Sequence, residues 1–344
     1  MRTVSLDVHG DASQLALVSE RGEVLLEMKV PTEREALRAV VGGIPGPKRV
    51  VFEEGPLSGM IYDALRDVAE EIISCDPSHN ALIALAEDAS DERDARRLAK
   101  LAQLGAVRPV YVAPEPYRTL RSLLVHDHRT QRSLTGVKNR IKGLCRRLGI
   151  QARGQAIYWH GQRAEQLKKI ENGELRWQMK SLYRQLDLLR RERVGAHRVL
   201  GQMAKKLPAI VRLESIPGVG PITARTLVGW IADPQRFKSR NAISSYVGLG
   251  LGQGWTNWKP VGHARASKRG NRELKRVLFL AAYAAAQSKS ALGRRYEGRR
   301  QVGWEESKAI RDLARTILVI ACSIWRKGKE YDDSLVKVPQ TSPG

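Results

Sequence analysis

Cysteine is scarce in this sequence of 344 residues, which has only Cys75, Cys145 and Cys322. The three are far apart and odd in number, so the sequence indicates neither a disulfide framework nor a Cys-x-x-Cys zinc site. Free cysteine packs as a small apolar side chain, and we therefore expect three buried thiols without a chemical role.

Long apolar runs are also missing. No stretch approaches the roughly 18 uninterrupted apolar residues of a membrane-spanning helix. The opening Met-Arg-Thr-Val-Ser-Leu-Asp has no apolar core of the kind found in a signal peptide. The sequence therefore predicts a soluble, intracellular protein that does not act at a membrane.

Acidic residues are scarce in the larger, C-terminal part of the chain. Residues 1–114 carry 13 Lys and Arg against 19 Asp and Glu, a net charge of −6, whereas residues 115–344 carry 46 against 17, a net charge of +29. An acidic module joined to a strongly basic one suggests a carboxylate site working on a polyanion that the other part holds. Nucleic acid is the polyanion we expect. An anionic membrane surface is the competitor, and the lack of long apolar runs counts against it.

The first 114 residues alternate short apolar runs with turn signals. Residues 3–8, 13–19 and 23–30 predict three strands joined by turns at Gly10-Asp11 and Arg21-Gly22. The pattern continues with a helix over 32–42, a strand over 48–53, a helix over 61–69 and a strand over 71–74. Three hairpin-linked strands followed by alternating helix and strand predict a mixed sheet with helices on its faces, an order that matches a ribonuclease H-like α/β fold.

Four carboxylates stand where this fold would bring them together. Asp7 and Glu53 end apolar strands, at the point where strands deliver side chains to a sheet edge. The apolar spacing of residues 95–104 predicts a helix with Asp91 and Asp94 on one face. Acidic residues are common in the first turn of a helix, where the dipole favours anions, so a purely structural role is the alternative. As a quartet, the carboxylates would hold two Mg²⁺ ions, which activate an attacking oxygen and stabilise a leaving one in phosphoryl transfer.

Residues 115–205 predict an extended, basic helical arm. Apolar residues recur at helical spacing over 118–148. A second seam alternates steps of four and three residues at Leu175, Met179, Leu182, Leu186 and Leu189. The seam is short, so a helical hairpin within the chain and a coiled coil between chains are both open. His126 and His128 flank Asp127 and could suggest a metal site, but a solvated, charged helix face is the better interpretation.

From Leu207 the sequence predicts a second globular part, over residues 206–330. Its segment Ile-Pro-Gly-Val-Gly at residues 216–220 has the form of a helix-hairpin-helix turn, in which Gly218 and Gly220 let backbone amides approach a phosphate. A plain tight turn between packed helices is the alternative. The excess of positive charge around the turn favours phosphate contact.

A glycine-rich loop with aromatic and cationic side chains follows, over residues 248–272. Such a loop is suited to gripping a nucleic-acid backbone. The candidate nucleic-acid-binding residues of this half are Gly218, Gly220, Lys259, Lys268, Arg269, Asn271 and Arg272. Apolar helices are predicted over 274–286 and about 305–325, and residues 331–344 predict a disordered tail.

Five of these motifs, in this order and spacing, resemble the DEDD-type insertion-sequence transposases, which include the Piv-type invertases and the bridge-RNA-guided recombinases. The motifs are Ser5-Leu6-Asp7-Val8, Phe52-Glu53-Glu54-Gly55-Pro56, Asp91-Glu92-Arg93-Asp94-Ala95-Arg96-Arg97-Leu98-Ala99, Ile216-Pro217-Gly218-Val219-Gly220 with Ala224, and Tyr246-Val247-Gly248-Leu249 with Ser267-Lys268-Arg269-Gly270-Asn271. Each motif is weak alone, but together they cover nearly the whole chain.

The resemblance implies a RuvC-like domain over residues 1–114 whose acidic quartet binds Mg²⁺, a coiled-coil arm over 115–205 and a mostly α transposase domain over 206–330. It also implies a serine in the last domain that attacks a DNA phosphodiester and forms a covalent link. The expected partners are target and donor DNA, a structured non-coding guide RNA that pairs with both, and further copies of the chain in a dimer or tetramer. The expected location is the bacterial cytoplasm, in association with the nucleoid.

The chain departs from the family pattern at the nucleophile. Counting from Gly248-Leu249 brings the serine position to Thr256, which is followed by Asn257. A threonine hydroxyl can act as a nucleophile, although its extra methyl group crowds in-line attack and restricts its rotamers. Two alternatives to a working recombinase follow. One is a transposase-derived regulator that binds nucleic acid without cutting, and the other is a RuvC-like metal nuclease that needs the quartet but not Thr256.

Overall fold

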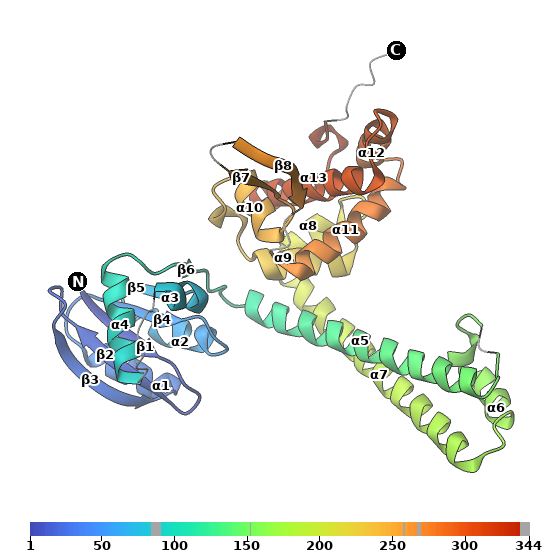
Figure 1. Cartoon of the computed structure of the whole chain (residues 1–344), viewed down its shortest axis with the longest axis horizontal. Helices are drawn as coiled ribbons and strands as arrows, with labels where there is room; N and C mark the ends of the chain where they lie inside the picture. Colours follow the sequence, from blue (N-terminus) through green and yellow to red (C-terminus); the bar gives the residue numbers. More distant parts are fainter. Residues whose placement is uncertain (84–90, 152, 257–258, 267–269, 338–344) are drawn as a thin grey trace. The chain divides into compact units, whose positions relative to one another are not determined.

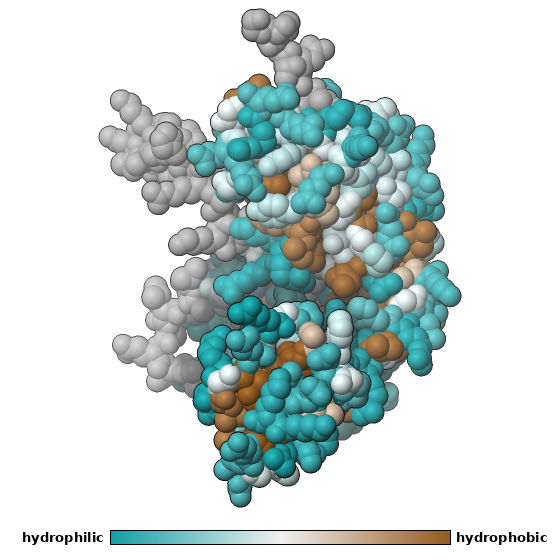
Figure 2. Space-filling model, turned by 90° about the vertical axis from the view of Figure 1, so that its right-hand side faces the viewer, coloured by the Kyte–Doolittle hydropathy of each residue, from teal (hydrophilic) through white to brown (hydrophobic). Residues whose placement is uncertain are grey.

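A computed structural model describes residues 1–83, 91–151, 153–256, 259–266 and 270–337. The chain divides into two compact units, Met1–Glu115 and Pro116–Gly344. Each unit is described by itself (Figure 1). Among the described residues no helix is both long and apolar enough to cross a membrane. The face seen in Figure 2 is mainly hydrophilic, and its apolar areas are interrupted by polar side chains.

The first unit is built on a mixed sheet. Its strands are β1 (Arg2–Asp7), β2 (Ala12–Val18), β3 (Val24–Pro31), β4 (Lys48–Glu53), β5 (Glu71–Cys75) and β6 (Pro109–Val110), in the order β3-β2-β1-β4-β5-β6. β1, β2 and β3 pair antiparallel as consecutive hairpins, while β4 lies parallel to both β1 and β5. The predicted mixed sheet is confirmed, and its strand order is compatible with a ribonuclease H-like fold.

Helices cover both faces of this sheet because its strands bury side chains on both sides. The helices of the unit are α1 (Arg34–Gly43), α2 (Ser58–Leu65), α3 (Pro77–Ile83) and α4 (Asp91–Gln103). Val50 and Phe52 of β4 share one apolar core with residues of α1 and α2. Val51, between them, belongs to a second core with Leu98 of α4. The alternation along β4 therefore places α4 on the face opposite α1 and α2.

Two details of the first unit differ from the sequence prediction. α2 ends at Leu65 rather than at residue 69, because the amides of Val68 and Ala69 both donate to the Leu65 carbonyl and close a turn. Leu104, expected on the apolar stripe of α4, is 71% exposed. It lies beyond the last helical residue, where Gly105 takes a left-handed conformation at φ 64° and turns the chain away.

The second unit begins with two long helices that pack against each other. α5 (Tyr117–Arg147) is followed by the short helices η1 (Ala156–Tyr158) and α6 (His160–Lys168), and α7 (Gly173–Lys205) returns along α5. Met179, Leu182 and Leu186 of the predicted seam are buried against apolar residues of α5. Of the two arrangements left open by the sequence, the structure has the hairpin within one chain.

The rest of the second unit is mostly helical. Its elements are α8 (Pro208–Glu214), α9 (Pro221–Ile231), η2 (Pro234–Arg236), α10 (Arg240–Val247), β7 (Leu251–Thr256), β8 (Lys259–Ala266), α11 (Arg272–Ala286), α12 (Ala291–Gln301), α13 (Glu306–Lys327) and η3 (Asp333–Leu335). A single apolar cluster joins α8, α9, α11 and α13 to the first turns of α5. The base of the long hairpin is therefore part of this core.

The glycine-rich segment after α10 was expected to be a loop, but it contains an antiparallel hairpin of β7 and β8. Thr256, the last residue of β7, pairs with Lys259, the first residue of β8. The register shifts between Gly252 and Gly254, and glycine is common at such irregularities because it tolerates their backbone conformations. The glycines that suggested a loop therefore belong to a strand with a register shift.

The predicted disorder of the tail is wrong for residues 331–337. Val336 is buried in the main core of the unit. The Asp333 carboxylate accepts a hydrogen bond from the Ala291 amide at 3.1 Å, and the Arg295 guanidinium donates to the Lys337 carbonyl at 2.6 Å. One apolar anchor and two polar contacts are enough to hold a short segment that composition alone would leave free. Residues 338–344 lie outside the described residues.

Candidate functional site

The topology of the sheet brings Asp7 and Glu53 to one edge. β1 and β4 are parallel neighbours with Leu6 opposite Phe52, so the residues that follow these two, Asp7 and Glu53, leave the sheet side by side. Both line a cavity of about 310 Å³, together with Asp94 of α4. Three of the four predicted carboxylates therefore face the same space.

α4 is held in place by a buried contact with β1. The Ser5 hydroxyl donates to the Ala95 carbonyl at 2.6 Å, and Ser5 itself is fully buried. Ser5 precedes Asp7 by two positions, so the two side chains point to the same face of the sheet. The contact therefore fixes the first turn of α4, with Asp91 and Asp94, beside Asp7.

The fourth predicted carboxylate, Asp91, lies near Asp7, and His9 contacts both of them. His9 Nε2 lies 3.1 Å from Asp7 Oδ2 and 3.5 Å from Asp91 Oδ1. Ligand atoms of Asp7, His9 and Asp91 all lie within 4.8 Å of one another. Asp7 is thus the common member of two groups, one with Glu53 and Asp94 and one with Asp91.

Asp7 is a partly buried carboxylate whose negative charge is not fully balanced by the groups around it. Burial raises the pKa of Asp7 above its ordinary value, and the charges of Asp91 and Asp94 raise it further, although His9 opposes both effects. Arg97 lies 3.9 Å from Asp94 rather than against Asp7. A divalent cation beside Asp7 would relieve this repulsion, and oxygen donors of this kind suit Mg²⁺ or Mn²⁺.

Two members of the site were not identified from the sequence. The Asn80 amide, which is buried, donates to Glu53 Oε1 at 2.9 Å and so fixes the orientation of that carboxylate. His9 is the other, and its position two residues after Asp7 was a usable signal. Asn80 gave no such signal, because it belongs to a helix after β5 that carries no motif.

In the second unit, Thr256 is the last residue of β7 and stands opposite Lys259, the first residue of β8. Lys268 and Arg269 lie outside the described residues. Asn271 caps α11, because its side-chain oxygen accepts a hydrogen bond from the Leu274 amide at 3.0 Å. Arg272, next to it, is exposed at the start of the helix.

The structure joins the two halves of the last family motif. A Cβ placed on Gly270, which has φ 107°, would lie 2.4 Å from the Gly248 nitrogen. The Asn271 amide donates to the Tyr246 carbonyl at 2.9 Å. The chain therefore leaves α10 and returns to α11 at one backbone crossing, which only glycine permits at position 270.

The two glycines of the helix-hairpin-helix turn have different surroundings. Gly218 has φ 85°, and a Cβ there would lie 2.3 Å from the Ala281 carbonyl oxygen of α11. Its lack of a side chain is therefore required for packing. Gly220 precedes α9, and a Cβ there would meet no atom within 4 Å. Of the two, Gly220 is the one whose Cα faces open space.

The expectation of a solvated helix face at residues 126–128 is wrong for Asp127, which is buried. His197 Nε2 of α7 lies 3.1 Å from Asp127 Oδ1, and His128 lies 3.1 Å from a carboxylate oxygen of Glu273 in α11. The cause is the packing of α5 against α7, a helix that lies far away in the sequence. These charges connect the base of the long hairpin to the bundle.

The three cysteines are free and buried, as expected. Burial raises the pKa of Cys75 to about 11 and that of Cys322 to about 12, so neither thiol is ionised at neutral pH. No sulfur chemistry is therefore indicated at the site.

Two family profiles match this chain. A DEDD transposase profile for IS110 elements matches residues 4–149, and the profile of the transposase IS116/IS110/IS902 family matches residues 211–297. The first match contains all four carboxylates, and the second contains Thr256.

Two curated proteins are similar to the chain. The transposase for insertion sequence element IS1111A of Coxiella burnetii is 28% identical over 198 residues, which are 55% of this chain and 53% of that protein. An uncharacterized 43.6 kDa protein of insertion element IS110 from Streptomyces coelicolor is 28% identical over 155 residues, 45% of this chain and 38% of that protein. The matches thus span about half or less of the length of each relative.

Proposed function

Because this chain belongs to the DEDD-type insertion-sequence transposases, we propose that it is an enzyme that cuts and rejoins DNA. The observation that carries the proposal is the cavity shared by Asp7, Glu53 and Asp94, with Asp91 next to Asp7. In this reading residues 1–114 are the metal-binding domain, 115–205 the arm and 206–330 the transposase domain.

We propose that the four carboxylates hold two Mg²⁺ ions, the number found in other phosphoryl-transfer sites with several acidic ligands. When bound, the metal would lower the cost of developing charge on the attacking and leaving oxygens. Asp7 would be the central ligand, since it contacts both groups of acidic side chains. Asn80 would hold Glu53 in position, and the uncharged cavity wall at Leu98 and Leu101 would limit water.

Thr256 is the proposed nucleophile of the second unit. Its hydroxyl oxygen would form a bond to phosphorus, one P–O bond of the strand would break, and the hydroxyl proton would pass to solvent or to a base. The released strand end would carry the oxygen of the broken bond. Rejoining reverses these changes with another strand end as the attacking group, so bond count is conserved and no external energy source is needed.

The proposed partners are target and donor DNA and a guide RNA from non-coding DNA beside the gene. Further copies of the chain are also expected, because four strand breaks in two duplexes require several active sites. The net charge of +29 on residues 115–344 supports a polyanionic partner.

The test is a Mg²⁺-dependent reaction of the full chain with RNA from its flanking DNA and with matched donor and target duplexes. Denaturing gels would separate free DNA from a protein-linked strand. We expect an adduct with the unaltered protein and none with Thr256→Ala or Asp94→Asn. Glu92→Gln, in the same turn of α4 but outside the cavity, is the matched control and should react normally. Thr256→Ser should form the adduct faster, because serine lacks the methyl group that crowds the attack.

Two other outcomes would replace the proposal. Free nicks without an adduct, lost in Asp94→Asn but not in Thr256→Ala, would identify a metal nuclease. Tight nucleic-acid binding with neither nicks nor adducts would identify a regulator derived from a transposase, the alternative that threonine in place of serine at position 256 motivates.

A further inference from the structure

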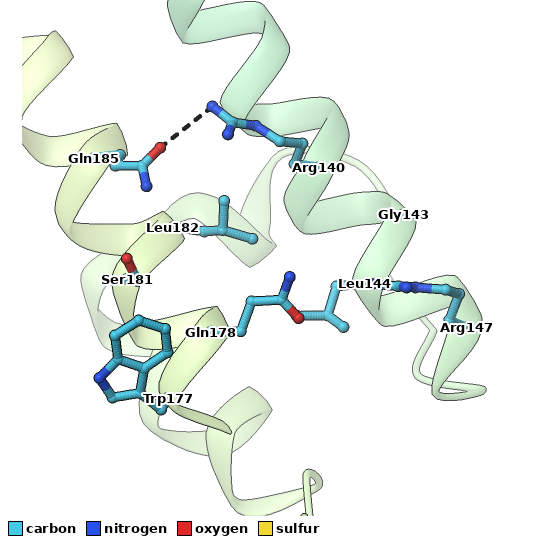
Figure 3. A pocket seen from close by; sticks show the side chains of 9 residues that line it. All are labelled: Arg140, Gly143, Leu144, Arg147, Trp177, Gln178, Ser181, Leu182 and Gln185. Atoms are coloured by element: carbon cyan, nitrogen blue, oxygen red, sulfur yellow. Dashed lines mark hydrogen bonds between the residues drawn. The ribbon is translucent and has the colours of Figure 1, made fainter. Parts of the chain in front are cut away.

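A groove runs between the last turns of α5 and the first turns of α7, toward the end of the long hairpin at which the two helices are connected (Figure 3). Its volume is about 420 Å³, and we call it the arm groove. The side chains that give it its chemistry are Arg140 and Arg147 of α5 and Trp177, Gln178, Ser181 and Gln185 of α7. Among the residues that the structure describes, no carboxylate lines it. The groove therefore combines an aromatic ring, two cations and several neutral hydrogen-bonding groups.

Trp177 is the unusual member of this set. Its side chain is 65% exposed, although it lies one turn into α7 and only two positions before Met179, which is completely buried. Exposed indole rings are uncommon, because a ring of this size gains much from burial. An exposed ring at the mouth of a groove is suited to stacking with a flat ligand.

The two arginines lie on the same side of α5. They are seven residues, or two helical turns, apart, which corresponds to about 10 Å along the axis. The Arg140 guanidinium donates to the Gln185 side-chain oxygen at 3.2 Å across the groove, and this contact holds the amide toward the opening (Figure 3). Both arginines lie on the helix opposite Trp177, so anionic groups next to a base stacked on that ring would face cations across the groove.

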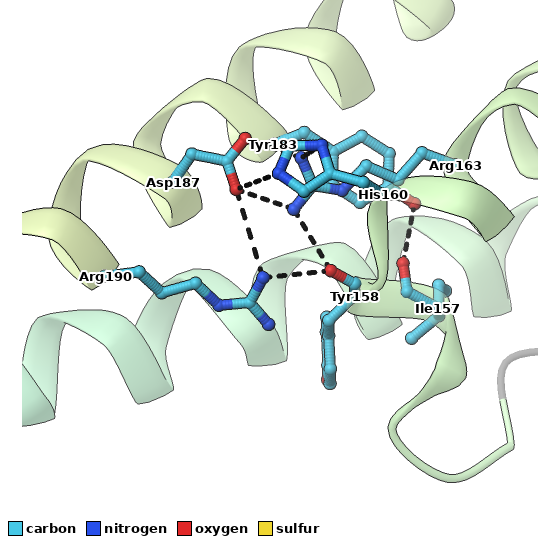
Figure 4. Close-up of polar contacts among 7 residues, drawn as sticks. All are labelled: Ile157, Tyr158, His160, Arg163, Tyr183, Asp187 and Arg190. Carbon is cyan, nitrogen blue, oxygen red and sulfur yellow. Dashed lines mark hydrogen bonds and ion pairs between the residues drawn. The ribbon is translucent and has the colours of Figure 1, made fainter.

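Polar and ring contacts hold α6 and η1 against the helix that carries Trp177. Arg163 of α6 donates to both carboxylate oxygens of Asp187 at 2.6 and 2.7 Å, and its guanidinium lies over the Tyr183 ring at 4.6 Å (Figure 4). Arg163 and Arg190 both donate to the Tyr158 carbonyl at 3.1 Å. These contacts tie η1 and α6 to α7 within two turns of Ser181 and Gln185. A ligand would thus meet a preformed surface.

We propose that the arm groove binds an unpaired nucleotide of a single-stranded nucleic acid, with the base stacked on Trp177 and the adjoining phosphates at Arg140 and Arg147. Aromatic stacking beside a cationic track is the general means by which proteins hold unpaired strands. A duplex is a poor fit, because its bases present no free face. The site is distinct from the carboxylates and from Thr256, so it does not depend on the proposed catalytic function.

A second copy of the chain is a less suitable occupant. α5 carries nine Lys and Arg against one Asp, and α7 carries eight against three acidic residues. Two copies meeting through this groove would bring like charges together, which is unfavourable without a counter-ion. A polyanion has the opposite preference.

The test measures binding of the full chain to a labelled oligonucleotide by fluorescence anisotropy, as single-stranded RNA, single-stranded DNA and duplex of one sequence. Moderate salt, about 0.3 M, weakens the phosphate contacts made elsewhere on this basic chain while leaving stacking in place. Trp177→Ala should weaken binding of the single strand about tenfold and leave duplex binding unchanged. Trp177→Phe should lose less single-strand affinity than Trp177→Ala. Trp159→Ala removes another exposed tryptophan, outside the groove, and should leave the affinity unchanged.

A second variant blocks the groove without removing a contact. Gly143 lines it, and a Cβ there would meet no atom within 4 Å, so Gly143→Met fills the space and improves the helix. The matched control is Gly136→Met, one heptad earlier on α5, also with no atom within 4 Å and outside the groove. We expect Gly143→Met to lose single-strand binding and Gly136→Met to retain it, with unfolding temperatures no lower than that of the unaltered protein.

A photo-crosslink from a 5-iodouracil oligonucleotide should map to the peptide that contains Trp177. The proposal fails if Trp177→Ala and Gly143→Met both bind the single strand normally, or if the crosslink maps only outside α5 and α7. It also fails if Trp177→Ala changes the sedimentation coefficient while leaving nucleic-acid affinity intact, since the groove would then be a contact between copies. The ratio of RNA to DNA affinity identifies the natural strand. None of these measurements needs strand exchange or Mg²⁺, so a failed catalytic test would not affect them.

Discussion

Asn80 is the residue whose position most directly affects the carboxylate site, although no motif contains it. Its amide donates to Glu53 at 2.9 Å and it is 5% exposed. A ligand carboxylate that loses such a partner becomes free to rotate, and losses of this kind typically weaken metal binding about 10- to 100-fold.

We therefore predict that Asn80→Ala weakens Mn²⁺ binding within that range while leaving the thermal unfolding of the second unit unchanged. Isothermal titration calorimetry with Mn²⁺ measures the affinity. His79→Ala, at the neighbouring position of α3, is the control and should bind Mn²⁺ normally. Equal affinity for Asn80→Ala and the unaltered chain would show that Glu53 needs no partner, or that it does not bind the metal.

Gly218 and Gly220 allow a comparison between a glycine needed for packing and one in open space. A Cβ on Gly218 would lie 2.3 Å from the Ala281 carbonyl oxygen, and its φ of 85° is strained for any other residue. We expect Gly218→Ala to lower the free energy of unfolding by about 2 kcal/mol or more. Gly220→Ala should cost less than about 1 kcal/mol, because its added methyl group meets nothing. Chemical denaturation followed by circular dichroism measures both, and similar losses for the two variants would contradict the packing argument.

At the scale of the element, the strands and helices of the first unit followed directly from apolar spacing. β1 and β4 are short runs of buried residues ending in an acid, and α4 has apolar residues at helical intervals. Such patterns are local, so the sequence is sufficient to predict them. Asp7 and Glu53 could be paired for the same reason, since parallel neighbouring strands end at one edge.

Elements that depend on long-range contacts were not predictable in this way. β7 contains two glycines among six residues, and a glycine-rich segment with few apolar residues gives no strand pattern. Asp127 looked solvated because its partner His197 is 70 positions away in the sequence. The segment 331–337 is ordered by contacts with α12 that composition does not indicate. In each case a distant part of the chain decides the local structure.

The ion pair between α6 and α7 gives a prediction with a defined pH dependence. The Arg163 guanidinium holds the pKa of Asp187 below its ordinary value of 3.8, despite some opposing effect of burial. A carboxylate with a lowered folded-state pKa stabilises the fold above its unfolded pKa, and this stabilisation is lost as the pH falls through the folded value. The loss is therefore confined to pH below about 4.

We expect Asp187→Asn to destabilise the arm by about 2 kcal/mol at pH 7, toward the low end for buried pairs because the aspartate is partly exposed. The difference from the unaltered chain should be constant from pH 7 to about 5 and shrink below 4. Hydrogen exchange in residues 156–168 at several pH values measures it, and Glu192→Gln on the exposed side of α7 is the control. A gap that stays at its full size as the pH falls well below 4 would exclude charge as its source.

At the scale of the whole molecule, the two units separate opposite charges. Residues 1–114 carry −6 and residues 115–344 carry +29. The proposed metal lies in the acidic unit, whereas most cations available for phosphates lie in the basic one. Chelation with EDTA should therefore abolish strand breakage while changing nucleic-acid affinity less than about twofold.

Filter binding and cleavage gels on the same samples test this separation, and added Mg²⁺ should restore cleavage. Raising the salt concentration, in contrast to chelation, should weaken binding steeply. The reason is that binding releases counterions from the phosphates, and high salt opposes this release. Loss of binding on chelation would mean that the metal, rather than the basic unit, holds the nucleic acid.

The crossing of Gly248 and Gly270 affects how this chain can change over evolution. Because Gly248 and Gly270 meet at one backbone contact, the positions of α10 and α11 do not depend on how many residues connect Gly250 to Gly270. Insertions, deletions or a transplanted segment from another chain would leave α10 and α11 in place as long as both glycines remain. We therefore expect the hairpin that contains Thr256 to tolerate changes of length and sequence that would disrupt the helices supporting it.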